Sequence, residues 1–100
     1  MTTHQRRRYL IAYDIGDDKR RARVARILQG YGDRVQFSVF VVDTKPSRLV
    51  ALKVALLAEL DWHSDSVLVG DLGSVDDAAK RRFEYLGRTR PVTDSQSFIV

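Results

Sequence analysis

A lone carboxylate followed by a run of arginines is the part of this sequence whose residue types could carry out chemistry. Asp14 ends an apolar stretch that begins at Tyr9, and Arg20, Arg21 and Arg23 follow shortly after it. A carboxylate is a hard oxygen ligand suited to Mg²⁺, and arginines bind phosphate oxygens strongly. The grouping therefore predicts a site for a divalent cation and a phosphodiester, centred on Asp14.

Asp14 alone offers too few ligands for a cation. One carboxylate makes a poor Mg²⁺ site, whereas two are sufficient when water and a substrate phosphate complete the octahedron. A two-fold dimer would supply the second carboxylate, because a residue near the axis meets its own copy. We therefore expect Mg²⁺, or another divalent cation such as Mn²⁺, to activate a water for in-line attack on a phosphodiester, with Asp14 as the catalytic residue. The alternative is that Asp14 is an ordinary turn aspartate.

The residues that we expect to contact nucleic acid follow this aspartate along the chain. They are Arg20, Arg21, Arg23, Arg34, Ser38 and Phe40. The arginines would contact backbone phosphates, the serine would donate to a phosphate or sugar oxygen, and the phenylalanine ring would stack on a base. Each has an ordinary alternative: the arginines solvate a helix face, the serine faces loop backbone, and the phenylalanine packs in the core.

Other catalytic arrangements find no support in the sequence. The chain has no cysteine, which excludes disulfides and thiolate zinc sites. His63 has no matching histidine or cysteine for a metal, and His4 lies in an N-terminal arm that we expect to be flexible. Neither a glycine-rich phosphate loop nor a Ser-His-Asp triad is indicated.

The positive charge is concentrated at the two ends of the chain. Residues 1–36 hold nine Lys/Arg against four Asp/Glu, which gives a net charge of +5. Residues 37–79 carry a net charge of −4, and residues 80–100 carry +3. If the two ends meet in space they form one basic surface, for which phosphate is the favoured partner.

Hydrophobic periodicity predicts alternating strands and helices. One helix is capped by Asp17 or Asp18 and ends at Gly30–Gly32, and a second opens at Thr44–Ser47 and stops near Asp61. A short helix or loop follows at 76–82. The expected strands are Tyr9–Asp14, Val35–Val42, Ser66–Leu72, Phe83–Leu86 and Ser97–Val100. Because helices separate the early strands, we expect parallel neighbours or right-handed crossovers.

These elements predict a single α+β domain of the ferredoxin-like type over residues 1–100. Residues 1–8 would form a flexible basic arm, and residues 88–100 a linker and last strand. Both faces of the first two strands are apolar, yet two helices can cover only one face. We therefore expect a homodimer that covers the second face; the alternative is that the extra strand and the loops cover it.

The apolar run from Tyr9 to Tyr13 is too short for a signal-peptide core or a membrane span. Together with the absence of cysteine, this predicts a soluble, cytoplasmic protein that has no membrane partner.

Three sequence segments resemble the small CRISPR-associated nuclease family, the Cas protein numbered two. They are YLIAYDI, DDKRRARVARIL and RVQFSVF, and the later FEYLG and SFIV segments agree. The resemblance spans about residues 9–100. It implies a homodimer whose C-terminal strand is exchanged onto the partner's sheet, and metal-dependent hydrolysis of single-stranded RNA or double-stranded DNA. It also implies a place in CRISPR spacer acquisition, bridging dimers of the Cas integrase.

By motif, Asp14 matches the metal-binding aspartate of this family. Positions associated with nucleic-acid handling match Arg21, Arg23, Arg34, Ser38 and Phe40. Two positions depart from the family pattern: Val41 stands where many members carry an acid, and Gly16 replaces a commoner small polar residue or proline. The lost acid would weaken a contact behind the metal ligands.

Two functional classes remain open from the sequence. One is a magnesium-dependent endonuclease, and the other is a non-catalytic adaptor that holds DNA and integrase. A more distant alternative is a toxin-like ribonuclease of the same fold. A basic dimer with one aspartate per chain suits each of the first two.

Overall fold

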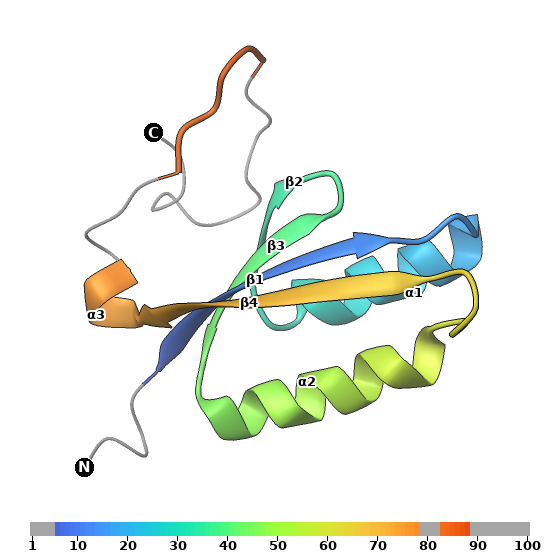
Figure 1. Ribbon diagram of the computed structural model, residues 1–100, viewed down its shortest axis with the longest axis horizontal. Coiled ribbons are helices and arrows are strands. Elements are labelled where there is room, and N and C mark those ends of the chain that lie inside the picture. The colour runs from blue at the N-terminus through green and yellow to red at the C-terminus, as the bar shows by residue number, and fades with distance from the viewer. Residues whose placement is uncertain (1–5, 79–82, 89–100) are drawn as a thin grey trace.

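The computed structural model describes residues 6–78 and 83–88 of the chain, as an antiparallel sheet with two long helices (Figure 1). The elements in chain order are β1 (Arg7–Asp14), α1 (Asp18–Gln29), β2 (Asp33–Gln36), β3 (Val39–Thr44), α2 (Pro46–Glu59), β4 (Ser66–Ser74) and α3 (Val75–Ala78). The order of strands in the sheet is β2-β3-β1-β4. This β-α-β-β-α-β sequence with β1 in the interior of the sheet is ferredoxin-like, which confirms the expected fold class.

The strand predicted at Val35–Val42 is wrong, because the chain reverses direction within it. Phe37 and Ser38 form a turn, and β2 and β3 pair antiparallel on either side of it. The β1 strand also pairs antiparallel with both β3 and β4. The expectation of parallel neighbours is therefore wrong as well, since the hairpin brings β3 back beside β1 in the opposite direction.

The two long helices begin and end close to where the sequence places them. Asp17 caps α1, accepting a hydrogen bond of 2.9 Å from the backbone N–H of Arg20, and this interaction lowers the pKa of Asp17. Gly30 follows the last residue of α1, where its N–H bonds the carbonyl oxygen of Ile27 at 3.1 Å. Helix α2 starts at Pro46, whose missing N–H and fixed φ suit the first turn.

One face of the sheet carries the helices and most of the core. Tyr9, Ile11 and Tyr13 of β1 and Phe40 and Val42 of β3 pack there. From the two helices this core receives Val24, Ala25, Leu28, Leu49, Leu52 and Leu56. Strand alternation sends Leu10, Ala12 and Asp14 to the opposite face, which we call the helix-free face.

The helix-free face is covered in part by the segment 83–88. Phe83 packs against Val35 and Val41, and the Tyr85 hydroxyl donates to the carbonyl oxygen of Val35 at 2.6 Å. The strand predicted at Phe83–Leu86 is wrong, because residues 83–86 form no strand and do not pair with the sheet. Leu68 of β4 remains 64% exposed on this face. The segment 83–88 thus covers part of the helix-free face, which we expected a second copy of the chain to cover.

Two of the basic residues near the N-terminus belong to the sheet. Arg7 and Arg8 lie in β1 instead of a flexible arm, because Asp71 and Asp43 hold their guanidinium groups in ion pairs. The predicted strand Ser97–Val100 and its exchange, His4, and most C-terminal cations lie outside the described residues. No helix among residues 6–78 and 83–88 is long and apolar enough to cross a bilayer.

Candidate metal and nucleic-acid site

Asp14 is the last residue of β1, and its side chain is exposed on the helix-free face. Its register partner on β4 is Ser66, which is also exposed. No ion pair joins Asp14 to any other residue within the described segments. The carboxylate is therefore accessible to a cation or a ligand from solvent.

The β2–β3 turn is tied to the strand end that carries Asp14. The Tyr13 N–H donates to the Ser38 carbonyl oxygen at 3.0 Å, and the Tyr13 hydroxyl donates to the Phe37 carbonyl oxygen at 3.3 Å. Because these two bonds come from the residue before Asp14, they fix the turn beside the end of β1. The backbone of Ser38 thus lies beside Tyr13, the residue before Asp14.

Two arginines surround the ring of Phe37 at this turn. The Arg21 Cζ and the Arg34 Cζ each lie 5.9 Å from the ring centroid of Phe37. We call Arg21, Arg34 and Phe37 the arginine cluster. Arg21 also donates to the Ile15 carbonyl oxygen at 3.0 Å, which anchors it to the loop directly after Asp14.

Arg34 is held mainly by aromatic rings. Its Cζ lies 5.1 Å from the ring centroid of Phe40, and its Nη2 is 3.5 Å from the Tyr13 hydroxyl. Its Nε is buried and has no hydrogen-bond partner in the described parts of the chain. A guanidinium that rests on rings and lacks a carboxylate partner keeps its capacity to bind an anion.

The structure places Arg34 and Asp14 on different faces of the sheet. Arg34 packs on Tyr13 and Phe40, which belong to the helix-covered face, whereas strand alternation sends Asp14 to the helix-free face. Phe37 lies at the turn between them. A nucleic-acid strand would have to pass over this turn to meet both groups.

Phe40 has none of its surface exposed. It packs in the helix-covered core, with its ring stacked at a centroid distance of 6.3 Å from the ring of Tyr13. This corrects the expectation that Phe40 stacks on a base, because a fully buried ring cannot reach one. Its observed contact with Arg34 makes it a support for that guanidinium.

Arg20 and Arg23 face away from the turn, toward carboxylates of other elements. Arg20 Nε bonds Asp65 Oδ2 at 2.7 Å, and Arg23 Nε bonds Glu59 Oε1 at 2.6 Å. The hydrogen bonds from Arg20 lower the pKa of Asp65. These pairs join α1 to the end of α2 and the start of β4, and they leave less of the arginine charge for phosphate.

The described residues contain no group of three or more His, Asp, Glu or Cys side chains that could hold a metal ion. Asp14 matches the hard oxygen chemistry of Mg²⁺, but a single chain offers only this one exposed carboxylate at the strand end. The donor set fits a divalent cation only when water, a substrate phosphate or a second chain completes it.

Two aromatic residues near the site did not stand out in the sequence. Phe37 is 55% exposed at the turn, and Tyr85 reaches the same hairpin from the far end of the described chain. The sequence Gln36-Phe37-Ser38, in which a large apolar residue stands between two polar ones, could have indicated that the Phe37 ring is exposed. Nothing in the local sequence indicates the position of Tyr85, because its contact with Val35 is long-range.

Comparison with protein families and known structures gives a consistent result. A family model for the CRISPR associated protein Cas2 matches residues 7–79. The CRISPR-associated endoribonuclease Cas2 1 of Rhodospirillum rubrum is 36% identical, with an alignment that covers 92% of this chain and 89% of that protein.

Solved structures of similar proteins share the fold. The crystal structure of Streptococcus pyogenes Cas2 superposes with a TM-score of 0.71 at 33% identity, covering 80% of this chain and 99% of that chain. A chain of a partial Cas6-RT-Cas1–Cas2 complex superposes with a TM-score of 0.55 at 33% identity, covering 66% of this chain and 78% of that chain.

Proposed function

Because this chain belongs to the Cas2 family of CRISPR-associated proteins, we propose that it is a metal-dependent endonuclease that hydrolyses phosphodiester bonds. The similar protein of Rhodospirillum rubrum is named an endoribonuclease, so RNA is the first substrate to test and double-stranded DNA the second. The single observation that carries the proposal is the exposed Asp14 carboxylate at the end of β1, beside a turn bordered by arginines.

The residues of this chain have separate tasks in the proposed reaction. Asp14 would hold Mg²⁺ or Mn²⁺ directly or through water, and such an ion would supply an activated water and neutralise charge on the phosphodiester. Arg21 and Arg34 hold the backbone phosphates of a strand that passes over the β2–β3 turn. Ser38 donates its hydroxyl hydrogen to a phosphate or sugar oxygen at the same turn. Arg20 and Arg23 contribute mainly to the packing of α1, since both form ion pairs with carboxylates outside this helix, whereas Arg21 pairs with the exposed Asp18 of its own helix.

A second copy of the chain is part of the proposal. One Asp14 per chain is a poor cation site, and a two-fold axis near the end of β1 would bring two copies of this carboxylate together. The exposed Leu68 on the helix-free face is consistent with a partner on that side. The homodimer therefore supplies both a second carboxylate and cover for apolar surface.

A non-catalytic role is the second candidate. The superposition on a chain of a Cas1–Cas2 complex favours an adaptor that holds DNA and joins integrase dimers during spacer acquisition. In this role the arginine cluster binds DNA backbone, and Asp14 has no chemical task. The two roles differ in what happens when Asp14 loses its charge.

The test is the Asp14→Asn variant, which removes the charge and keeps the shape of the side chain. With added Mg²⁺, cleavage of single-stranded RNA and of double-stranded DNA should fall by about a hundredfold or more, since the cation contributes several kcal/mol to the transition state. The exposed Asp76, far from the turn in α3, gives the matched control Asp76→Asn, which should cleave like the wild type.

Cleavage by Asp14→Asn at the wild-type rate contradicts the nuclease assignment to this site. Intact spacer acquisition in the same variant, together with lost cleavage, assigns the biological role to the adaptor. Thermal unfolding of both variants checks that the fold is retained.

A further inference from the structure

A hollow of about 280 Å³ opens at the β2–β3 turn. Its lining consists of Gln36, Phe37, Ser38, Val39, Tyr85 and Arg88. The residue types are mixed: two aromatic rings, an amide, a hydroxyl and a guanidinium around one aliphatic side chain. A few polar groups among apolar ones are typical of small-ligand sites, and this volume is near the lower end of their range.

The hollow is on the same face of the sheet as Asp14. Val39 pairs with Ala12, two residues before Asp14 on β1, and both belong to the helix-free face. The Tyr85 hydroxyl donates to the Val35 carbonyl oxygen at 2.6 Å, which fixes the 83–88 segment over β2. Burial raises the pKa of Tyr85, so the phenol stays protonated at neutral pH and remains a donor. A ligand in the hollow would therefore lie on the same face of the sheet as the proposed catalytic aspartate.

Phe37 joins the hollow to the arginine cluster. Its ring is 55% exposed while two guanidinium groups lie 5.9 Å from its centroid. The carbonyl oxygen of Phe37 accepts the Tyr13 hydroxyl, so the backbone beneath the ring is anchored. An aromatic ring bordered by arginines is the arrangement with which proteins stack bases of single-stranded nucleic acid and bind the adjoining phosphates.

We propose that this hollow binds one unpaired nucleotide, with its base stacked on Phe37. The Gln36 amide and the Ser38 hydroxyl offer donors and acceptors to the edge of the base, and Arg88 offers a charge to its phosphate. A base inside a duplex is already stacked and paired, so it could enter only after being flipped out, at a cost of a few kcal/mol. This inference rests on the proposed function in taking nucleic acid as the substrate, and it adds the place on the chain that holds one base of a single strand.

Binding measured in EDTA tests the inference without any cleavage. A fluorescein-labelled single-stranded RNA, a single-stranded DNA of the same sequence and the corresponding DNA duplex serve as probes. We expect Phe37→Ala to weaken single-strand binding about tenfold and to leave duplex binding within twofold of the wild type. Phe37→Tyr keeps the ring and should retain wild-type affinity.

The matched control for loss of an exposed aromatic is Trp62→Ala. Trp62 is 77% exposed and adjoins the groove between α2 and β4, and β4 lies on the other side of β1 from the β2–β3 hairpin. It should bind every probe like the wild type. An equal loss on single strand and duplex in Phe37→Ala, or no loss on either, overturns the inference. A sedimentation mass that halves in Phe37→Ala also overturns it, because the ring would then belong to a subunit contact.

A fluorescent reporter gives an independent reading of stacking. Trp62 is the only tryptophan of the chain, so the double variant Phe37→Trp/Trp62→Phe carries a single indole at the turn. Stacking of a base should quench its emission as single-stranded oligonucleotide is added, with saturation at the concentration found by binding. Emission that is unchanged at saturating oligonucleotide overturns the inference.

Failure of this inference can be told apart from failure of the nuclease proposal. In EDTA, Asp14→Asn should not lose single-strand affinity, because Asp14 has no part in stacking and its loss removes a negative charge that repels phosphate. If Asp14→Asn cleaves normally while Phe37→Ala loses single-strand affinity, the nucleotide site stands and the catalytic assignment fails. If Asp14→Asn loses cleavage while Phe37→Ala binds normally, the reverse holds.

Discussion

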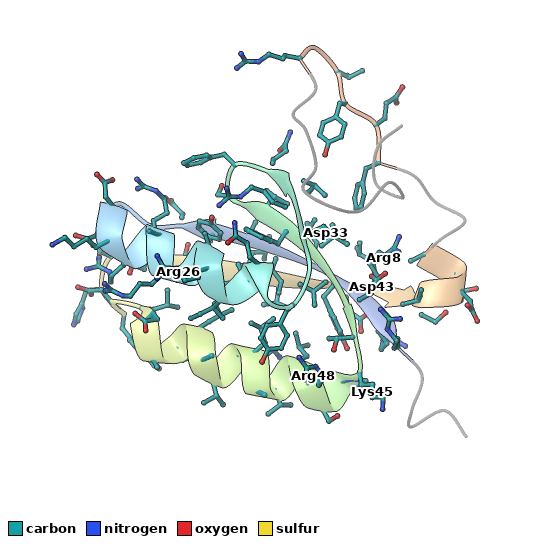
Figure 2. The ribbon with its side chains drawn as sticks, turned by 180° about the vertical axis from the view of Figure 1, so that it is seen from behind. Arg8, Arg26, Asp33, Asp43, Lys45 and Arg48 are labelled. Atoms are coloured by element: carbon teal, nitrogen blue, oxygen red, sulfur yellow. The ribbon has the colours of Figure 1, made fainter. Side chains whose placement is uncertain are left out.

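The charged residues at the two ends of β1 lie on the same face of the sheet but have opposite environments. Arg8 near the start of the strand and Asp14 at its end both point to the helix-free face, separated by Leu10 and Ala12. Arg8 is 7% exposed, and Asp43 on β3 binds it with two hydrogen bonds of 2.7 Å. Figure 2 shows Arg8 and Asp43 next to one another on neighbouring strands.

Asp14 has the opposite environment. It is exposed, and within the described residues no cation pairs with it, although several arginines follow it in the sequence. Those arginines are engaged with carboxylates, carbonyl oxygens or aromatic rings instead. A buried charge with a counter-ion in the same chain has a structural role. An exposed carboxylate without such a counter-ion is available to a ligand.

The largest effect is expected in the free energy of unfolding, when the same Asp→Asn substitution is made at the two ends of this face. Asp43→Asn removes the counter-ion of a buried guanidinium and should lower the free energy of unfolding by about 3 kcal/mol. Asp14→Asn removes an exposed charge and should change it by less than about 0.5 kcal/mol. Urea unfolding of both variants at neutral pH measures the difference.

A control for this comparison replaces both members of the buried pair. Arg8→Met with Asp43→Leu leaves no unpaired charge, so it should recover much of the stability that Asp43→Asn loses. If Asp14→Asn destabilises the protein as much as Asp43→Asn does, the contrast between the two ends is wrong, and Asp14 has a structural role.

Much of the fold was predictable because local signals agree with it. The apolar run before Asp14, the Asp17 cap and the glycine after α1 each act through nearby backbone, and each appears where the sequence places it. Proline at the start of α2 acts in the same way. These interactions span a few residues, so one segment of sequence contains all the information that they require.

The hairpin at Phe37–Ser38 was not predictable from such signals. The turn contains no glycine, proline or asparagine, and the apolar pattern continues through it into β3. An uninterrupted strand would place Ser38 and Phe40 on one face. The turn breaks that alternation, so Phe40 enters the core while Phe37 remains exposed.

The partners of the arginines were unpredictable for a different reason. Arg20 pairs with Asp65, 45 residues away, and Arg8 pairs with Asp43, 35 residues away. Such pairs depend on strand register and on how helices pack, which local patterns do not determine. The arginines of α1 therefore look alike in the sequence, although the fold pairs Arg20 and Arg23 with carboxylates of other segments and places Arg21 at the turn.

The second prediction extends the comparison from carboxylates to arginines. Arg34, which rests on aromatic rings, should bind phosphate, whereas Arg23 is paired with Glu59. We expect Arg34→Met to weaken binding of single-stranded RNA in EDTA by about fivefold to tenfold. The slope of log affinity against log salt should decrease in magnitude by about 0.7, as one phosphate contact is lost. Titrations at several salt concentrations measure both quantities.

Two matched variants make this test specific. Arg23→Met removes the same charge from a paired position and should change the affinity less than twofold. Arg34→Lys keeps the charge and should preserve the salt slope, with thermal unfolding as the check on the fold. Equal losses in Arg34→Met and Arg23→Met would mean that only overall charge matters, and the distinction between paired and stacked arginines would then fail.

The smallest expected effect is a loss of stability at acid pH, where the aspartates of ion pairs become protonated. Hydrogen bonds from Arg20 lower the pKa of Asp65 in the folded protein below its unfolded value of 3.8. A carboxyl whose folded pKa is lowered contributes stability that is fully present above the unfolded pKa. This contribution shrinks as the pH falls below about 4 and is gone below the folded pKa.

Asp65→Asn should therefore have a lower Tm than the wild type between about pH 5 and 7, and the two proteins should converge as the pH approaches 2. Arg20→Met removes the other partner and should reproduce the same convergence, because the carboxyl then titrates without its main hydrogen-bond donor. Thermal unfolding in steps of pH measures both series. A difference in Tm that stays constant down to pH 2 would show that Asp65 stabilises the protein without its charge, and the ion pair between α1 and the start of β4 would then be a consequence of packing instead of a cause.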